Sequence, residues 1–187
     1  MENDPGWRKF VFMTLVVVAT VGIIGFVGFK LWFVFPVQKI HGLTYLGTPD
    51  ILIYYGAINV LDVLGVNLFA RLLYFRWVKT DRPLQDGIWI GIYLLVFSWV
   101  TDIVIYIFIR KTLPTLQEYF FGKNQPEIGI AWIVGVCAAA LAGWLEARRR
   151  DPSIRNMKVL ATGAIAGLVV VSIALTVIGI GLFDIRP

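Results

Sequence analysis

The chain is too apolar for a soluble protein: 58% of its 187 residues are hydrophobic and its mean hydropathy is +0.78, against roughly 45–50% apolar residues in soluble domains. The net charge of +5 does not indicate nucleic-acid binding, because most Lys and Arg residues flank apolar segments and form no basic stripe interleaved with aromatic residues. The single Cys and the single His exclude an intrachain disulfide, a bis-histidine haem and a histidine-rich metal site built from this chain alone. We therefore expect no nucleic-acid partner, no metal and no cofactor.

Five apolar segments are long enough to cross the roughly 30 Å hydrocarbon core, which takes about 20 residues of helix. The sequence predicts an all-α polytopic membrane protein with one membrane domain, residues 1–187, in the lipid bilayer of the cell membrane. The expected transmembrane helices are 10–35, 51–75, 87–109, 128–147 and 159–183. The remaining loops are too short for a separate soluble domain.

The first apolar run is too long for the core of a signal peptide and lacks a small-residue cleavage site, so we expect an uncleaved helix. Within it Ala19, Gly22, Gly25 and Gly28 recur at three-residue spacing. Such a narrow ridge of small residues would let a neighbouring helix approach closely.

Two segments that connect predicted helices have a composition that indicates their local structure. Residues 37–49 contain Gly42, Gly47 and Pro49, which predict a loop. Residues 112–127 are predicted either as a short helix lying in the membrane interface or as an irregular loop with aromatic side chains.

The second and third helices carry polar residues that a plain membrane anchor would avoid, because polar groups are costly in hydrocarbon. These candidate ion- or polar-ligand-binding residues are Asn59, Asp62, Asn67, Ser98, Asp102 and Tyr106. At 1.5 Å rise per residue, Asp62 falls near the midplane, while Asn59 and Asp102 both lie about one turn, roughly 5 Å, toward the outer side. We therefore expect Asn59 and Asp102 at similar depth, where they could face each other.

No basic residue of the chain lies at the depth of either aspartate, and three uses remain open. The aspartates are neutral hydrogen-bonding groups between helices, transient sites for a proton or cation, or partners for a cationic group of another subunit or ligand.

Residues 50–61, DILIYYGAINVL, resemble a helix of the J subunit of respiratory complex I that reads E-x-x-x-Y-x-G-A-I-x-V-L. In that family the helix connects quinone chemistry to proton pumping. The resemblance ends at Asp62, which replaces an apolar position, and it assigns no functional residue to this chain.

The fourth helix has the clearest packing pattern, with small residues at every fourth position: Ala131, Gly135, Ala139 and Gly143. The fifth helix contains Gly163-x-x-x-Gly167. Small residues at this spacing form a groove into which another helix backbone can dock. Whether the docking helix belongs to this chain or to another is left open by the sequence.

The distribution of Lys and Arg predicts the orientation. With the N-terminus in the cytoplasm, the inner side receives Arg8, Lys9, Arg76, Lys79, Arg82, Arg148, Arg149, Arg150, Arg155 and Lys158. The outer loops and tail then hold Lys39, Lys111, Lys123 and Arg186. The positive-inside rule therefore predicts a cytoplasmic N-terminus and an outer C-terminus.

No catalytic motif accompanies these features. The flanks of the two aspartates, VLDVLG and VTDIVI, lack the GxGD of intramembrane aspartyl proteases, and the sequence has no phosphate-binding loop or nucleophile elbow. We expect no catalytic residue and no catalytic activity of this chain alone.

The leading hypothesis is a non-catalytic subunit of a multisubunit membrane complex that packs partner subunits through small-residue helix faces. The alternative is a small homo-oligomeric transporter or channel for a proton, cation or small solute that uses Asp62 and Asp102.

Overall fold

The computed structural model describes residues 4–32, 37–40, 43–46, 48–109, 115–116, 125–151, 154 and 156–182. Five helices in it are long and apolar enough to span a membrane, which confirms the predicted all-helical membrane fold. Two of them end in π-helical turns, which carry the labels η1 and η2. The helices are α1 (Gly6–Trp32), α2 (Thr48–Phe69) with η1 (Ala70–Phe75), α3 (Pro83–Ile103) with η2 (Val104–Ile109), α5 (Gln125–Arg149) and α6 (Met157–Leu182).

The helices extend past the borders that hydropathy marks. α1 already begins at Gly6 and so includes Arg8 and Lys9, and α3 begins at Pro83. Proline suits the first helical position, because its missing N–H would have no partner inside the helix. Charged residues in these first turns are paired with other side chains, as described below, so they do not end the helix.

Residues 37–40 and 43–46 form two paired strands where the sequence predicted a loop. Strand β1 (Val37–Ile40) pairs antiparallel with β2 (Leu43–Leu46), with Val37 opposite Leu46. Branched and aromatic residues in both segments favour strands. The glycine and proline residues nearby favour a loop, which is why the sequence did not predict the strands. Most of the predicted interfacial segment 112–127 lies outside the described residues.

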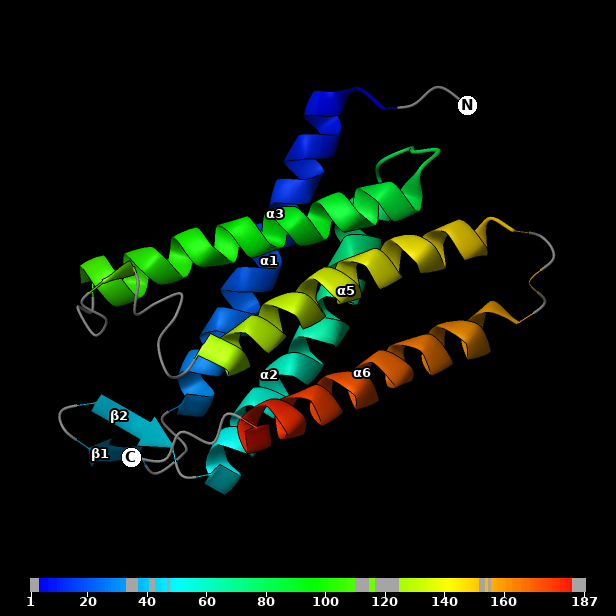
Figure 1. The fold of residues 1–187 in the computed structure, drawn as a ribbon. Coiled ribbons are helices and arrows are strands. Elements are labelled where there is room, and N and C mark those ends of the chain that lie inside the picture. The colour runs from blue at the N-terminus through cyan, green and yellow to red at the C-terminus, as the bar shows by residue number, and fades with distance from the viewer. Residues whose placement is uncertain are drawn as a thin grey trace.

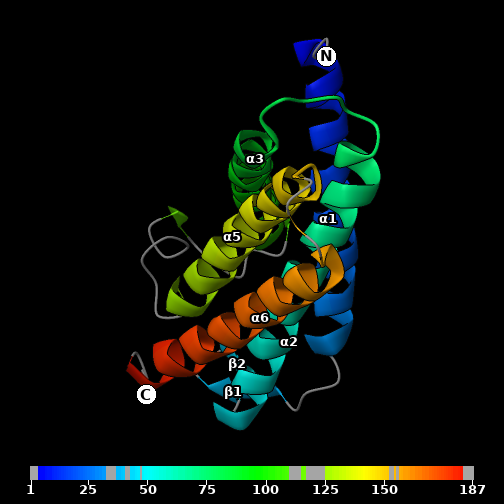
Figure 2. The same cartoon turned by 90° about the vertical axis from the view of Figure 1, so that its right-hand side faces the viewer.

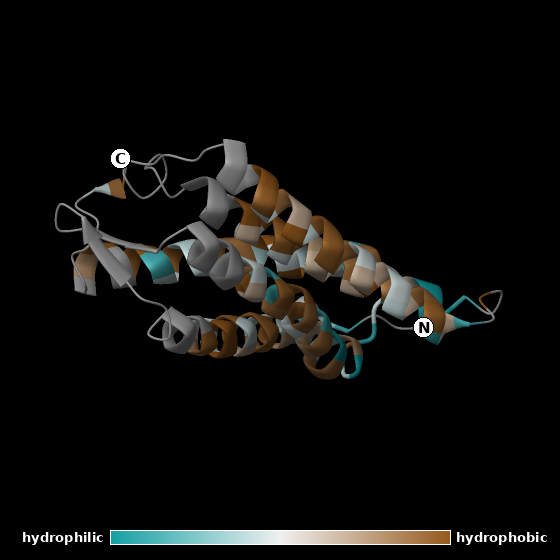
Figure 3. Ribbon diagram, turned by 90° about the horizontal axis from the view of Figure 1, so that it is seen from below, coloured by the Kyte–Doolittle hydropathy of each residue, from teal (hydrophilic) through white to brown (hydrophobic). Residues whose placement is uncertain are grey.

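The helices form two layers (Figures 1 and 2). α3, α5 and α6 lie side by side in one layer, and α1 and α2 cross behind them, with α5 in contact with α3, α2 and α6. The core lies between the layers and is built mainly from small and β-branched side chains, among them Val16, Val63, Ile90 and Ala138. Apolar side chains also cover much of the outside of the helices, whereas hydrophilic residues gather at the end of the bundle near the N-terminus (Figure 3).

The small-residue face of α5 is occupied by α3. A Cβ atom built on Gly91 would lie 3.0 Å from Val136 Cα, and one built on Gly135 would lie 3.3 Å from Leu94 Cδ2. Ala139, on the same face, is fully buried. The docking partner that the sequence left open is therefore another helix of the same chain.

Candidate functional site

The amide of Asn59 joins α2 to α6. Its Nδ2 donates a hydrogen bond of 2.6 Å to Thr176 Oγ1, and that hydroxyl in turn donates to the carbonyl of Ser172 at 2.9 Å. All three residues are buried. The structure thus pairs Asn59 with α6 and does not bring it to Asp102 of α3.

Asn67 joins α2 to α5. Its Nδ2 donates to the carbonyl of Val63 at 2.8 Å and to the carbonyl of Ala138 at 3.1 Å. The Oδ1 atoms of Asn59 and Asn67 are buried and accept no hydrogen bond from the described residues. Each asparagine therefore holds two helices together with its donor and leaves its acceptor unused.

The remaining predicted site residues lie on α2, α3 and η2. Asp62, Ser98 and Asp102 are half-buried on α2 and α3. Within the described part of the chain, Asp62 makes no hydrogen bond or ion pair. Tyr106 lies in η2 and its side chain is outside the described residues. The predicted role of these residues in binding an ion or polar ligand stays a prediction.

A polar cluster that sequence reasoning missed lies at the end of the bundle near the N-terminus. Asp86, in the first turn of α3, is only 6% exposed. Its Oδ2 accepts a hydrogen bond of 2.8 Å from the hydroxyl of Tyr74 and lies 3.5 Å from Lys9 Nζ. One carboxylate thereby connects α1, η1 and α3.

Thr80, in the connection between η1 and α3, collects three further contacts. Its Oγ1 accepts hydrogen bonds from Lys9 Nζ at 3.2 Å and from the backbone N–H of Arg82 at 3.1 Å. Its carbonyl accepts from the guanidinium of Arg150. The same guanidinium binds the buried carboxylate of Glu146 at 3.2 Å, so the C-terminal end of α5 is attached to the cluster.

Asp4 fastens the N-terminal segment to the same connection. Its carboxylate accepts the backbone N–H of Lys79 at 2.6 Å and pairs with Arg8 Nη1 at 2.8 Å. The hydrogen bond from Lys79, with a smaller contribution from the charge of Arg8, lowers the pKa of Asp4 below its ordinary value of 3.8. The carboxylate is therefore held in its charged form.

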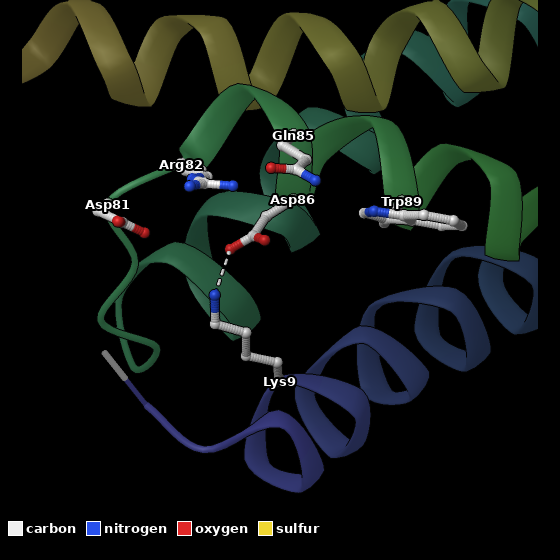
Figure 4. Close-up of a pocket in the computed structure, with 6 residues that line it drawn as sticks. All are labelled: Lys9, Asp81, Arg82, Gln85, Asp86 and Trp89. Carbon is white, nitrogen blue, oxygen red and sulfur yellow. Dashed lines mark hydrogen bonds and ion pairs between the residues drawn. The ribbon is translucent and has the colours of Figure 1, made fainter. Parts of the chain in front are cut away.

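A cavity of about 310 Å³ opens beside this cluster, between the start of α1 and the start of α3 (Figure 4). It is lined by Lys9, Asp81, Arg82, Gln85, Asp86 and Trp89. Both signs of charge occur in the lining, and the ion pair of Lys9 and Asp86 forms part of its wall. The described residues contain no group of three His, Cys, Asp or Glu side chains placed to hold a metal ion.

One feature of the sequence indicates this polar cluster, an acidic residue close to a predicted helix start. Basic residues at the ends of the apolar segments indicate topology, and Asp86 lies just before the predicted start of its helix at residue 87. An acidic residue just after Pro83 is the usual sign of a helix N-terminus, and it would have placed a carboxylate at the membrane border.

Four glycines of α1 and α6 have open space above them in the described part of the chain. A Cβ atom built on Gly22, Gly25, Gly163 or Gly167 would meet no other atom within 4 Å. Ala131, at the start of the α5 face, is half-buried. Of the small-residue faces that the sequence indicates, the one on α5 is used inside the chain and those on α1 and α6 are open.

The architecture defines a multi-pass membrane protein of five candidate spans. The chain matches no protein-family model, no curated protein and no solved structure. The short resemblance of residues 50–61 to the complex I helix thus gains no support from these comparisons, and function is argued from the contacts alone.

Proposed function

We propose that the protein is a non-catalytic integral membrane subunit of a multisubunit complex, and that α1 and α6 pack against partner subunits. The observation that carries this proposal is the open space over Gly163 and Gly167 of α6 and over Gly22 and Gly25 of α1. Small residues at helical spacing let two backbones approach closely, and van der Waals packing is a main source of helix association in lipid.

The geometry of α6 supports this assignment. Ala161, Ser172 and Thr176 are buried against the rest of the chain, whereas Gly163 and Gly167 are exposed. At 100° per residue, the two glycines lie on the side of the helix opposite these three residues. The small-residue face therefore points away from the bundle, where a helix of another subunit has access to it.

The polar groups within the membrane support a structural rather than a catalytic role. Asn59 and Asn67 use their donors to hold α2 against α6 and α5. Such bonds between helices stabilise a bundle.

For the orientation we infer a cytoplasmic N-terminus. The end of the bundle that contains the polar cluster also holds Arg76, Lys79, Arg148 and Arg149. An excess of Lys and Arg marks the cytoplasmic side of a membrane protein.

The test is extraction from the native membrane in mild detergent, followed by native gel separation and mass spectrometry of the band. We expect the wild-type chain to migrate with other subunits, and the double variant Gly163→Leu/Gly167→Leu to leave that band while its own thermal midpoint stays unchanged. Leu175→Phe, which adds bulk on another exposed part of α6, is the matched control and should stay in the complex. A wild-type chain that migrates alone or only with copies of itself contradicts the proposal.

One observation favours a second candidate, a small homo-oligomeric carrier or channel for a proton or cation. Asp62 is a carboxylate within a membrane span and has no hydrogen bond or ion pair among the described residues, and ionisable residues inside membranes often mark ion pathways. In this case the purified protein in liposomes should conduct protons or cations, and Asp62→Asn or Asp102→Asn should abolish the flux without unfolding the protein. Absence of flux from the wild-type protein excludes the carrier.

A further inference from the structure

The cavity beside Lys9 lies at the level where two membrane spans begin. Its lining residues come from the start of α1 and from the connection and first turns that open α3 (Figure 4), and the two spans begin at Gly6 and Pro83. A cavity at this level faces the lipid headgroups rather than the hydrocarbon. Its volume of about 310 Å³ is at the lower end of the roughly 300–1,000 Å³ of ligand sites, so it suits a small polar group.

Two cationic side chains in the lining retain hydrogen-bond donors for a ligand. The exposed guanidinium of Arg82 makes no hydrogen bond or ion pair with the described residues. The ammonium group of Lys9 contacts Thr80 Oγ1 and Asp86 Oδ2, which leaves one of its three N–H donors unused. Donors of this kind bind phosphate oxygens through charge-assisted hydrogen bonds.

The same cavity also offers a hydrogen-bond acceptor of opposite charge. Asp86 receives both of its hydrogen bonds on Oδ2, so its Oδ1 takes none from the described residues. Asp81 also lines the cavity, and the two aspartates balance the formal charges of Lys9 and Arg82. A ligand that carries both a phosphate and an ammonium group is therefore more complementary in charge to these lining residues than a purely anionic ligand is.

We propose that the cavity binds the headgroup of phosphatidylethanolamine from the adjoining leaflet. The phosphate lies against Lys9 and Arg82, and the primary ammonium donates to the free oxygen of Asp86. A choline headgroup lacks N–H donors for this bond, and a glycerol headgroup lacks the positive charge. Trp89, which is 53% exposed, lines the cavity near the start of a candidate span, and tryptophan is enriched at membrane interfaces. This site is independent of the partner-binding faces on α1 and α6.

The test is native mass spectrometry of the detergent-purified chain titrated with phosphatidylethanolamine, phosphatidylcholine or phosphatidylglycerol of identical acyl chains. We expect phosphatidylethanolamine to bind about tenfold tighter than the other two lipids, and Arg82→Gln to weaken it by about tenfold, the effect of losing a charge-assisted hydrogen bond. Arg76→Gln is the matched control, because Arg76 is exposed, stacks on Trp77 and does not line the cavity. It should bind like the wild type.

A second variant separates loss of the site from loss of the fold. Gln85 is an exposed lining residue, so Gln85→Trp should fill the cavity and remove the lipid without changing any charge or the thermal midpoint. Equal binding of the three lipids, stronger binding of phosphatidylglycerol, or no effect of Arg82→Gln and Gln85→Trp overturns the proposal. Displacement of the lipid by millimolar inorganic phosphate also overturns it, because the site would then select a free phosphate rather than a headgroup.

Discussion

Gly87 of α3 and Gly143 of α5 bring two helix backbones into direct contact. A Cβ atom on Gly87 would lie 3.0 Å from Gly143 Cα and 2.6 Å from the carbonyl oxygen of Ala139. A Cβ atom on Gly143 would in turn meet the carbonyl oxygen of Pro83. Backbone atoms cannot move aside as flexible side chains can, so the contact between α3 and α5 requires glycine on both helices.

We predict that Gly87→Ala and Gly143→Ala each destabilise the protein by about 1–3 kcal/mol, the usual cost of overfilling a packed contact. The measurement is the free energy of unfolding in mixed micelles of SDS and mild detergent. Gly163→Ala is the matched control, because it adds the same methyl group to a helical glycine with open space above it. Equal stability of all three variants would mean that α3 and α5 do not approach this closely.

The hydrogen bond from Tyr74 to Asp86 should be the strongest single contact of the polar cluster. Removal of the hydroxyl in Tyr74→Phe leaves a buried carboxylate with one partner fewer, which we expect to cost about 1–3 kcal/mol. Tyr93→Phe, whose hydroxyl lies 3.4 Å from its partner on Thr14, should change stability far less. The same unfolding assay, with a double-mutant cycle that adds Asp86→Asn, gives the coupling energy, and a coupling near zero would contradict the assignment.

The bond between Asn59 and Thr176 should hold α6 against α2. Hydrogen bonds between transmembrane helices contribute about 0.6 kcal/mol on average and about 1.7 kcal/mol at most, so we expect Thr176→Val to destabilise the protein within this range. Thr101→Val removes a hydroxyl that donates within its own helix, to the carbonyl of Phe97, and serves as control. A larger loss for Thr101→Val than for Thr176→Val would argue against this contact between α2 and α6.

Attachment of the N-terminal segment should depend on pH. Because folding lowers the pKa of Asp4 below 3.8, its contribution is complete above that value and is lost as the pH falls through the lower folded value. We expect the Lys79 amide, which donates to Asp4, to exchange with deuterium more slowly in the wild type than in Asp4→Ala at pH 6. The difference should shrink as the pH falls below 3.8 and vanish once Asp4 of the folded protein is protonated. A difference independent of pH would show that the charge of Asp4 plays no part.

The membrane fold could be predicted because each membrane-spanning helix has its own apolar segment in the sequence. Each span is a continuous apolar run, and the small residues of α5 repeat at a fixed interval that indicates close packing. The two paired strands at residues 37–40 and 43–46 could not be predicted, because the nearby glycine and proline residues favour a loop more strongly than such short segments favour strands.

The contacts between helices could not be predicted in the same way. Lys9 and Asp86 are 77 positions apart, and Asn59 and Thr176 are 117 apart, so only the folded arrangement brings them together. Depth in the membrane indicated that Asn59 and Asp102 could face each other, but depth leaves the rotation and neighbours of a helix undetermined. α5 and α6 pack against α2, and the side-chain amide of Asn59 donates its hydrogen bond to Thr176 of α6.

The contacts of Thr80 join residues that are far apart in the sequence, from the start of α1 to the end of α5. The two donors to the hydroxyl of Thr80, Lys9 and Arg82, lie before or at the start of α3 in the chain. The donor to the carbonyl of Thr80 is Arg150, which follows the last residue of α5. A chain cut before Arg150 therefore lacks one contact of the junction that Thr80 forms between the ends of the helices. Among the described residues, none of the contacts named for this junction involves α6, so the junction can form without that helix.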